Sequence, residues 1–139
     1  MSTPNTPHQT PRMTEVSGAE ALWLLEGSSY GRLVYVQREL PVLRPARHVW
    51  GVGRLVVRAP AAASAVPATA TYHVDDVDPA NGTGWTVTTT GPVEVVRDRD
   101  EAAHYRRTLT GWTYGPHDTF LRLRPQSITG FRLTMGDAR

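Results

Sequence analysis

Short segments of β type occupy most of the chain from residue 31 onwards, and they constrain the fold more than any other feature. Valine, threonine, leucine and aromatic residues recur in them with a period near two, which is typical of half-buried strands. Most of the segments are too closely spaced for the helical crossovers of a parallel sheet. The sequence therefore predicts a mainly β domain, a six- to seven-stranded antiparallel split β-barrel flanked by short helices. The expected strands are residues 31–36, 40–50, 54–58, 69–74, 85–96, 119–124 and 127–133.

Glycines mark two special places in this pattern. Residues 50–53 read Trp-Gly-Val-Gly and lie between two strand segments, so they predict a hairpin turn. Gly91 and Pro92 interrupt the longest strand signal. Such a pair indicates a bulge or bend of the kind that curls a sheet into a barrel.

Two short helices are expected beside the strands. Ser17 and Asp98 are good N-cap residues, and each is followed three positions later by a glutamate, as in a capping box. Apolar residues at helical spacing follow both caps. The first helix is expected to end at Gly27 and the second before Gly111.

The 139 residues fit one domain, which we place at residues 15–134. Residues 1–14 are polar and rich in proline, so we expect a disordered tail there, and a short C-terminal tail at 135–139. No apolar stretch approaches the roughly 20 residues that a membrane-spanning helix needs, and the N-terminus does not resemble a signal peptide. We therefore expect a cytoplasmic protein without a membrane partner.

The composition excludes several chemistries. The chain has no cysteine, so it has no thiol nucleophile, thiolate metal site or disulfide. All 15 basic residues are arginine, and the absence of lysine rules out a Schiff base or a phosphate-binding loop of the GxxxxGK type. The net charge is only +2, and the arginines around the second helix alternate with carboxylates. Ion pairing on a solvated face explains them better than nucleic acid does.

Polar clusters give no clear catalytic or metal site. The acidic segment 75–82 lacks the ligand spacing of a calcium loop, and a solvated turn is the better interpretation. The five histidines show no metal-binding spacing, so no metal site is predicted. His48 and His73 lie on expected strands, where ordinary pairing is favoured over a ligand contact. A serine-histidine-carboxylate triad stays open, because triads are recognised by geometry, although no GxSxG elbow is present.

Several fragments, in this order and spacing, resemble the pyridoxamine 5'-phosphate oxidase-like family, in particular its small actinobacterial members. The resemblance covers about residues 15 to 133. Its main fragments are LLEG at 24–27, GRLV at 31–34, VDDVDP at 74–79, GWTV at 84–87, LRP at 123–125 and TGFRL at 129–133.

This resemblance implies a flavin-binding split barrel that forms a homodimer, with FMN in two clefts between the subunits. It also implies an oxidoreductase acting on a small molecule, in which the flavin carries hydride or electrons and the protein positions the substrate. In this family basic and hydroxyl side chains hold the FMN phosphate at the end of the third strand and in the turn after it. Arg58 and Ser64 occupy matching positions.

Four further residues are cofactor-binding candidates. Arg47, with His48 beside it, stands where relatives often carry an asparagine. Arg132 near the last strand would close the cleft. Trp112 would either line the partner's cleft or cap its own barrel. For Arg58 the alternative role is an ion pair with a carboxylate such as Asp75.

Two alanines depart from the family pattern. Ala59 replaces a common hydroxyl residue, and Ala65 replaces a lysine. Each lost charge-assisted contact weakens binding by roughly 1.5 to 3 kcal/mol, so FMN is expected to bind less tightly. The alternative function is a non-enzymatic split-barrel dimer that has lost tight flavin binding and binds another ligand or acts as a scaffold.

Overall fold

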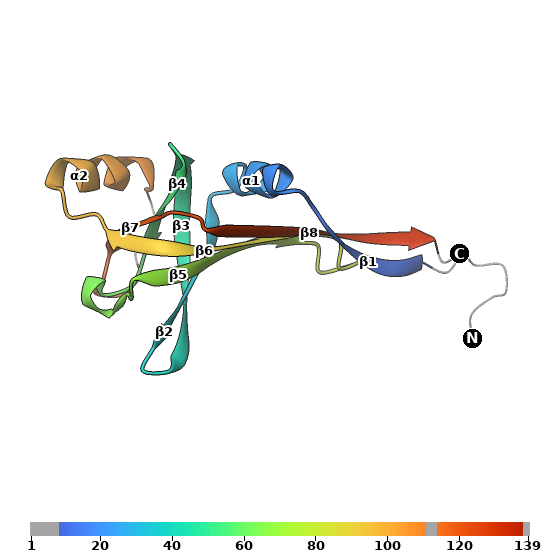
Figure 1. Ribbon diagram of the computed structural model, residues 1–139, viewed down its shortest axis with the longest axis horizontal. Coiled ribbons are helices and arrows are strands. Elements are labelled where there is room, and N and C mark those ends of the chain that lie inside the picture. The colour runs from blue at the N-terminus through green and yellow to red at the C-terminus, as the bar shows by residue number, and fades with distance from the viewer. Residues whose placement is uncertain (1–8, 111–113, 138–139) are drawn as a thin grey trace.

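The computed structural model describes residues 9–110 and 114–137, and the elements follow the order shown in Figure 1. The two α-helices are short, and most of the described chain is strand. The elements are β1 (Gln9–Glu15), α1 (Gly18–Glu26), β2 (Tyr30–Gln37), β3 (Leu40–Gly51), β4 (Arg54–Ala59), the 3-10 helix η1 (Ala63–Ala65), β5 (Thr69–Val77), β6 (Gly84–Val95), α2 (Arg99–Thr108), β7 (Thr119–Leu123) and β8 (Ser127–Asp137).

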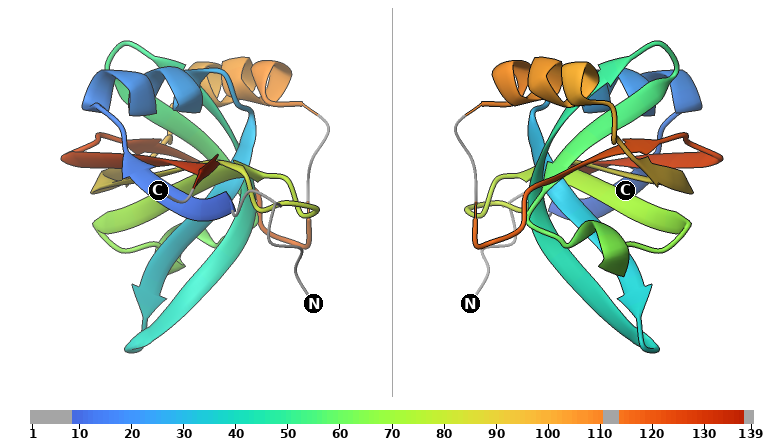
Figure 2. Two further views of the ribbon diagram at one scale, coloured as in Figure 1. Left: turned by 90° about the vertical axis from the view of Figure 1, so that its right-hand side faces the viewer. Right: turned by 90° about the vertical axis from the view of Figure 1, so that its left-hand side faces the viewer.

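The strands form one antiparallel sheet that closes on itself. Their order is β1-β8-β6-β5-β2-β3-β4-β7, and an additional pairing of β6 with β7 closes the barrel. The strands β5, β2, β3, β4, β7 and β6 make the barrel, while β8 and β1 continue the sheet beyond it (Figure 2). The predicted antiparallel split barrel is confirmed, with β1 as a strand that the sequence did not indicate.

The predicted bend at Gly91 and Pro92 is the place where the barrel closes. Residues 84–90 of β6 pair with β8, whereas residues 93–95 pair with β7. A Cβ added to Gly91 would lie 1.8 Å from the carbonyl oxygen of Arg124, so only glycine allows the chain that links β7 to β8 to pass so closely. The same edge of β6 therefore pairs first with β8 and then with β7.

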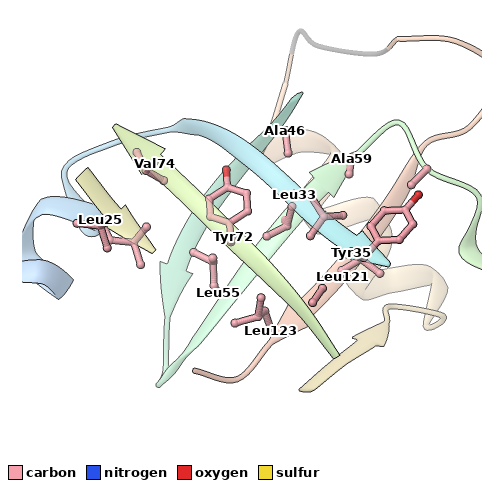
Figure 3. Close-up of a cluster of buried hydrophobic side chains, with 14 of the residues drawn as sticks. Leu25, Leu33, Tyr35, Ala46, Leu55, Ala59, Tyr72, Val74, Leu121 and Leu123 are labelled. Carbon is pink, nitrogen blue, oxygen red and sulfur yellow. The ribbon is translucent and has the colours of Figure 1, made fainter. Parts of the chain in front are cut away.

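The main core fills the barrel and the space under α1 (Figure 3). Both predicted N-caps are confirmed, because Ser17 accepts a hydrogen bond from the Glu20 amide at 3.1 Å and Asp98 accepts one from the Glu101 amide at 2.9 Å. Helix α1 thus begins at a fixed point and lays its buried face on the sheet. The largest fully buried side chains are Tyr72, Leu25, Leu33, Leu55, Leu121, Leu123, Val57, Val74, Val87 and Thr89.

Helix α2 covers a second, smaller cluster on the outer side of the barrel. Val56 of β4 and Phe120 of β7 are buried there with Leu109, which caps the end of the helix. The Arg122 guanidinium of β7 also donates to the Glu101 carboxylate of α2. No helix within the described residues is long and apolar enough to span a membrane.

The expected tails are shorter than predicted at both ends. Residues 9–14, assigned to a disordered tail, belong to β1, which pairs with β8 from Gln9 opposite Asp137 to Glu15 opposite Phe131. The same pairing makes residues 135–137 part of a strand. Backbone hydrogen bonds provide this pairing whatever the side chains are, so polarity and proline content were poor guides. Residues 1–8 and 138–139 lie outside the description.

His48 joins three elements inside the core. Its side chain is buried, its Nδ1 lies 2.6 Å from the Tyr72 hydroxyl, and its Nε2 lies 3.2 Å from both the Leu25 carbonyl oxygen and the Ser28 hydroxyl. Because a carbonyl can only accept, Nε2 carries the proton and Nδ1 accepts from Tyr72. Burial lowers the pKa of His48 from 6.5 to about 4, so the ring is neutral at pH 7. The ring fastens the end of α1 to β3 and β5.

The hairpin between β3 and β4 holds a strained residue. Val52 and Gly53 have positive φ angles of 52° and 72°, the pattern of a type I′ turn, and Val52 is 96% exposed. A β-branched side chain is disfavoured in this conformation, whereas asparagine adopts it readily. The predicted hairpin is confirmed, but valine, the residue at its first turn position, is disfavoured at a positive φ angle.

We expect Val52→Asn to raise the free energy of unfolding by about 1 kcal/mol, because it relieves the left-handed strain without removing buried contacts. Urea denaturation measures the change. Val77→Asn is the matched control, since Val77 is also exposed but lies in strand β5, and it is expected not to stabilise the protein. Equal effects of the two substitutions would contradict a conformational cause.

We also expect acid to destabilise the protein through His48. In the unfolded chain this group takes up a proton near pH 6.5, while in the folded chain it resists protonation down to about pH 4. Stability therefore falls as the pH drops from 6.5 to 4, by about 3 kcal/mol in total, with no further loss from this group below pH 4.

Comparing the wild type with His48→Gln by denaturation from pH 8 to pH 4 checks this expectation. Glutamine can still donate to Leu25 and accept from Tyr72, but it does not titrate. The difference between the two proteins at pH 8, where His48 is neutral in both states, is the reference. If the wild type lost no more stability than the variant between pH 6.5 and pH 4, His48 would not be the source.

Candidate functional site

Two arginines, of which Arg58 is buried, lie side by side on the outward-facing side of the barrel sheet. Arg47 of β3 and Arg58 of β4 are direct cross-strand neighbours, and Tyr30 of β2 and Phe120 of β7 extend the same row. The Arg47 guanidinium lies over the Tyr30 ring at 5.0 Å, and that of Arg58 lies over the Phe120 ring at 5.2 Å. Aromatic faces attract cations, so this row, which we call the arginine row, holds two positive charges in place.

Arg58 forms an ion pair, as the alternative interpretation proposed, but with a different carboxylate. Its Nε and Nη2 donate to the two oxygens of Asp118, each at 2.8 Å, and its Nη1 donates to the Leu109 carbonyl at 2.5 Å. The expected partner, Asp75, instead contacts Arg32 and His73. Asp118 directly precedes β7, the neighbour of β4, whereas Asp75 lies on β5, with β2 and β3 in between.

Arg47 lacks such a carboxylate within the described part of the chain. Its Nη1 donates to the carbonyl of Thr110, just after α2, and its buried Nε has no hydrogen-bond partner among the described residues. An unpaired buried N–H is costly and therefore calls for an acceptor. The arginine row thus combines two guanidinium groups with the single described carboxylate of Asp118, so it attracts anions.

The other predicted site residues fall at different places. Ser64 is exposed in η1, shortly after β4, so it lies on the chain close to Arg58. His48 belongs to the core network, where its ring nitrogens already have partners. Arg132 donates to Glu20 of α1 at 2.8 Å, on the part of the sheet that α1 covers, and is not brought to the arginine row. Trp112 lies outside the described residues.

Two further interpretations from the sequence are settled by hydrogen bonds. His73 pairs with Thr88 and Asp75, each at 2.9 Å, so the expected ordinary pairing is confirmed. His73 and Asp75 of this hydroxyl-imidazole-carboxylate line lie on β5, and Thr88 lies on β6. Both strands pair on both sides, so the backbone ladder already uses the N–H groups that an oxyanion would need. In segment 75–82, Asp78 and Asn81 accept from the amides of Ala80 and Thr83, which confirms a turn.

Sequence reasoning missed three residues of the arginine row. Tyr30 lies far along the chain from Asp118 and Phe120, and only the strand order places the three around Arg47 and Arg58. Asp118 carried one weak signal, a carboxylate directly before a predicted strand. Nothing in the sequence indicated which strand would lie beside it.

Solved structures share this architecture. A putative pyridoxamine 5'-phosphate oxidase from Corynebacterium glutamicum is 25% identical, with a TM-score of 0.70 and 98% of both chains covered. An FAD binding protein from Mycobacterium smegmatis is 26% identical, with a TM-score of 0.62, 86% of this chain and 96% of that chain covered. Both similarities extend over most of the barrel.

Sequence comparison points the same way. The uncharacterized protein Rv0080 of Mycobacterium tuberculosis is 33% identical over 145 residues, which cover 96% of this chain and 93% of that protein. The family model for pyridoxamine 5'-phosphate oxidase matches residues 17–132. This range contains the barrel, α1, α2 and both arginines, and the resemblance seen in the sequence is thereby confirmed. The chain belongs to the pyridoxamine 5'-phosphate oxidase family.

Proposed function

We propose that this protein is a homodimeric flavin-binding split barrel that uses FMN to oxidise or reduce a small molecule. The arginine row carries the proposal, because it holds two fixed guanidinium groups, of which only Arg58 pairs with a carboxylate, that of Asp118, among the described residues. Family membership and the likeness to an FAD binding protein support a flavin as the anion-bearing ligand.

The side chains of the row fit a flavin phosphate. A phosphate oxygen would give the buried Nε of Arg47 the acceptor that it lacks among the described residues. Both oxygens of Asp118 hold the Arg58 guanidinium in place. Arg58 would therefore act on the phosphate mainly through its fixed positive charge, and less through a bidentate pair of hydrogen bonds. A bound flavin would supply hydride or electron transfer. The residues of this chain would bind and orient it.

An exposed apolar strip supports the homodimer. Val36 and Leu43 of the β2–β3 hairpin are each more than half exposed, as is Tyr30 at the arginine row. Val34 lies opposite Leu43, and Val36 lies opposite Pro41, on one face of the hairpin. Contiguous apolar patches on soluble proteins often mark association sites. A second copy placed on this strip would border the arginine row.

One observation favours the alternative function, a dimer that has lost tight flavin binding. Nε, Nη1 and Nη2 of Arg58 all donate within the chain. Ala65, at the end of η1, offers no charge where relatives have a lysine. In this case the row would bind a smaller or differently shaped anion.

Titration with FMN, followed by flavin fluorescence, tests the leading proposal. We expect saturable binding, and we expect Arg47→Gln to weaken it tenfold to a hundredfold, because one charge-assisted contact contributes roughly 1.5 to 3 kcal/mol. Riboflavin lacks the phosphate, so its weaker affinity should be the same for both proteins. Arg44→Gln, an exposed arginine of the same strand, is the control and should bind FMN normally.

Arg58 provides a second arm of this experiment. Arg58→Met leaves Asp118 without its partner, so we expect the free energy of unfolding to fall by on the order of 3 kcal/mol. The proposal that this protein binds a flavin would be refuted if the folded wild-type protein bound neither FMN nor FAD. Binding that is unaffected by Arg47→Gln would place the ligand elsewhere.

Sedimentation at micromolar concentrations tests the dimer. We expect a dimer for the wild type and a monomer for Leu43→Glu, since a charge in the apolar strip would be buried without a partner. Val77→Glu alters an exposed valine outside the strip and should remain dimeric. A wild-type monomer would rule out this part of the proposal.

A further inference from the structure

A second site lies between α1 and the core-facing side of the sheet, whereas the arginine row lies on the outward-facing side. Helix α1 lies along β8 (Figure 1), and the hollow beside its C-terminal half measures about 610 Å³. Such a volume is enough for a small organic molecule. Its lining residues are Trp23, Leu24, Glu26, Gly27, Asp76, Trp85 and Arg132.

One wall of this hollow is a single row of the sheet. Asp76 of β5 lies directly opposite Trp85 of β6, which lies opposite Arg132 of β8. The neighbouring row, Val74 and Val87, is buried in the core. The three side chains therefore continue the core-facing side of the sheet beyond the place where the core ends, and they meet α1 there.

Helix α1 forms the other wall and adds an aromatic face. Trp23 is 66% exposed, an unusual position for so large an apolar side chain. Glu26 lies in the last turn of the helix, near the negative end of the helix dipole, and no basic residue occupies that turn. Two tryptophans and the end of a helix thus face one hollow.

The charges of this hollow favour a cation. Within the described residues, Glu26 and Asp76 have no ion-pair partner. Arg132, the only cation of the lining, is already neutralised by Glu20 at 2.8 Å. Two carboxylates remain uncompensated, beside two indole rings whose faces also attract positive charge. An anionic ligand would meet repulsion here.

We infer that this hollow binds a small organic cation, an ammonium or guanidinium compound, whose charged group lies between Glu26 and Asp76 and whose carbon atoms contact Trp23 and Trp85. This site is separate from the arginine row, and it does not depend on flavin binding. It would give the protein a place for a positively charged substrate or effector.

Choline and agmatine are the probes, and they are added to the protein without flavin. We expect both to change tryptophan fluorescence in a saturable way and to release heat in calorimetry. The uncharged carbon isostere of choline, 3,3-dimethylbutan-1-ol, should bind at least about fivefold more weakly, because it keeps the shape but loses the attraction to the carboxylates and rings.

Substitutions at exposed positions separate this site from general effects. Asp76→Asn and Trp23→Leu should each weaken the binding of choline about fivefold or more, without loss of thermal stability, since both side chains are exposed. Glu39→Gln, which removes an exposed carboxylate from the turn between β2 and β3, should leave the affinity unchanged.

Three results would overturn the inference. They are no saturable binding of either cation up to about 20 millimolar, equal affinity for choline and its neutral isostere, or unchanged affinity in Asp76→Asn. A dissociation constant of about 20 millimolar corresponds to a binding free energy of only about 2 kcal/mol, and binding weaker than this does not support a specific site. Because flavin is absent, failure here leaves the FMN titration unaffected.

Discussion

The closure of the barrel by β6 is the constraint on which the rest of the structure depends. This strand pairs with β5 along one edge, while its other edge pairs first with β8 and then with β7. The exchange takes place at Gly91 and Pro92, where a side chain would collide with the carbonyl of Arg124. Once β7 lies beside β4, Asp118 reaches Arg58, and α2 can cover Val56 and Phe120. Because β8 leaves the barrel at the same point, it provides the surface on which α1 rests.

The two candidate sites, which lie on opposite faces of this sheet, differ in the sign of their charge. On the outer face the arginine row gathers two guanidinium groups between aromatic rings, and the carbonyls of Leu109 and Thr110 after α2 bind to them. On the face covered by α1, Glu26 and Asp76 lie beside two tryptophans. A net charge of +2 hides this separation, since the two regions nearly cancel in the sum. Electrostatic arguments for such a protein therefore need the positions of the charges.

The buried histidine shows why position decides the role of a side chain. The resemblance to relatives placed His48 beside Arg47 as a cofactor-binding candidate. In a strand, however, successive side chains point to opposite faces, so Arg47 faces outward while His48 enters the core. There it is held by Tyr72 and Leu25, and burial keeps it neutral. Neighbours in sequence can thus belong to a binding surface and to a structural network.

The sequence by itself determined strands β2 to β8, both helix caps, the hairpin at residues 50–53 and the special role of Gly91, because these depend on local periodicity, capping and turn geometry. It also determined the family, through fragments in a fixed order. Only the tertiary structure decided that Asp118 and not Asp75 pairs with Arg58, that Arg132 turns toward Glu20, and that residues 9–14 form a strand. These contacts join residues as far apart in the chain as Gln9 and Asp137, and they depend on which strands become neighbours. Strand order follows from the closure of the whole sheet, and no local pattern encodes it.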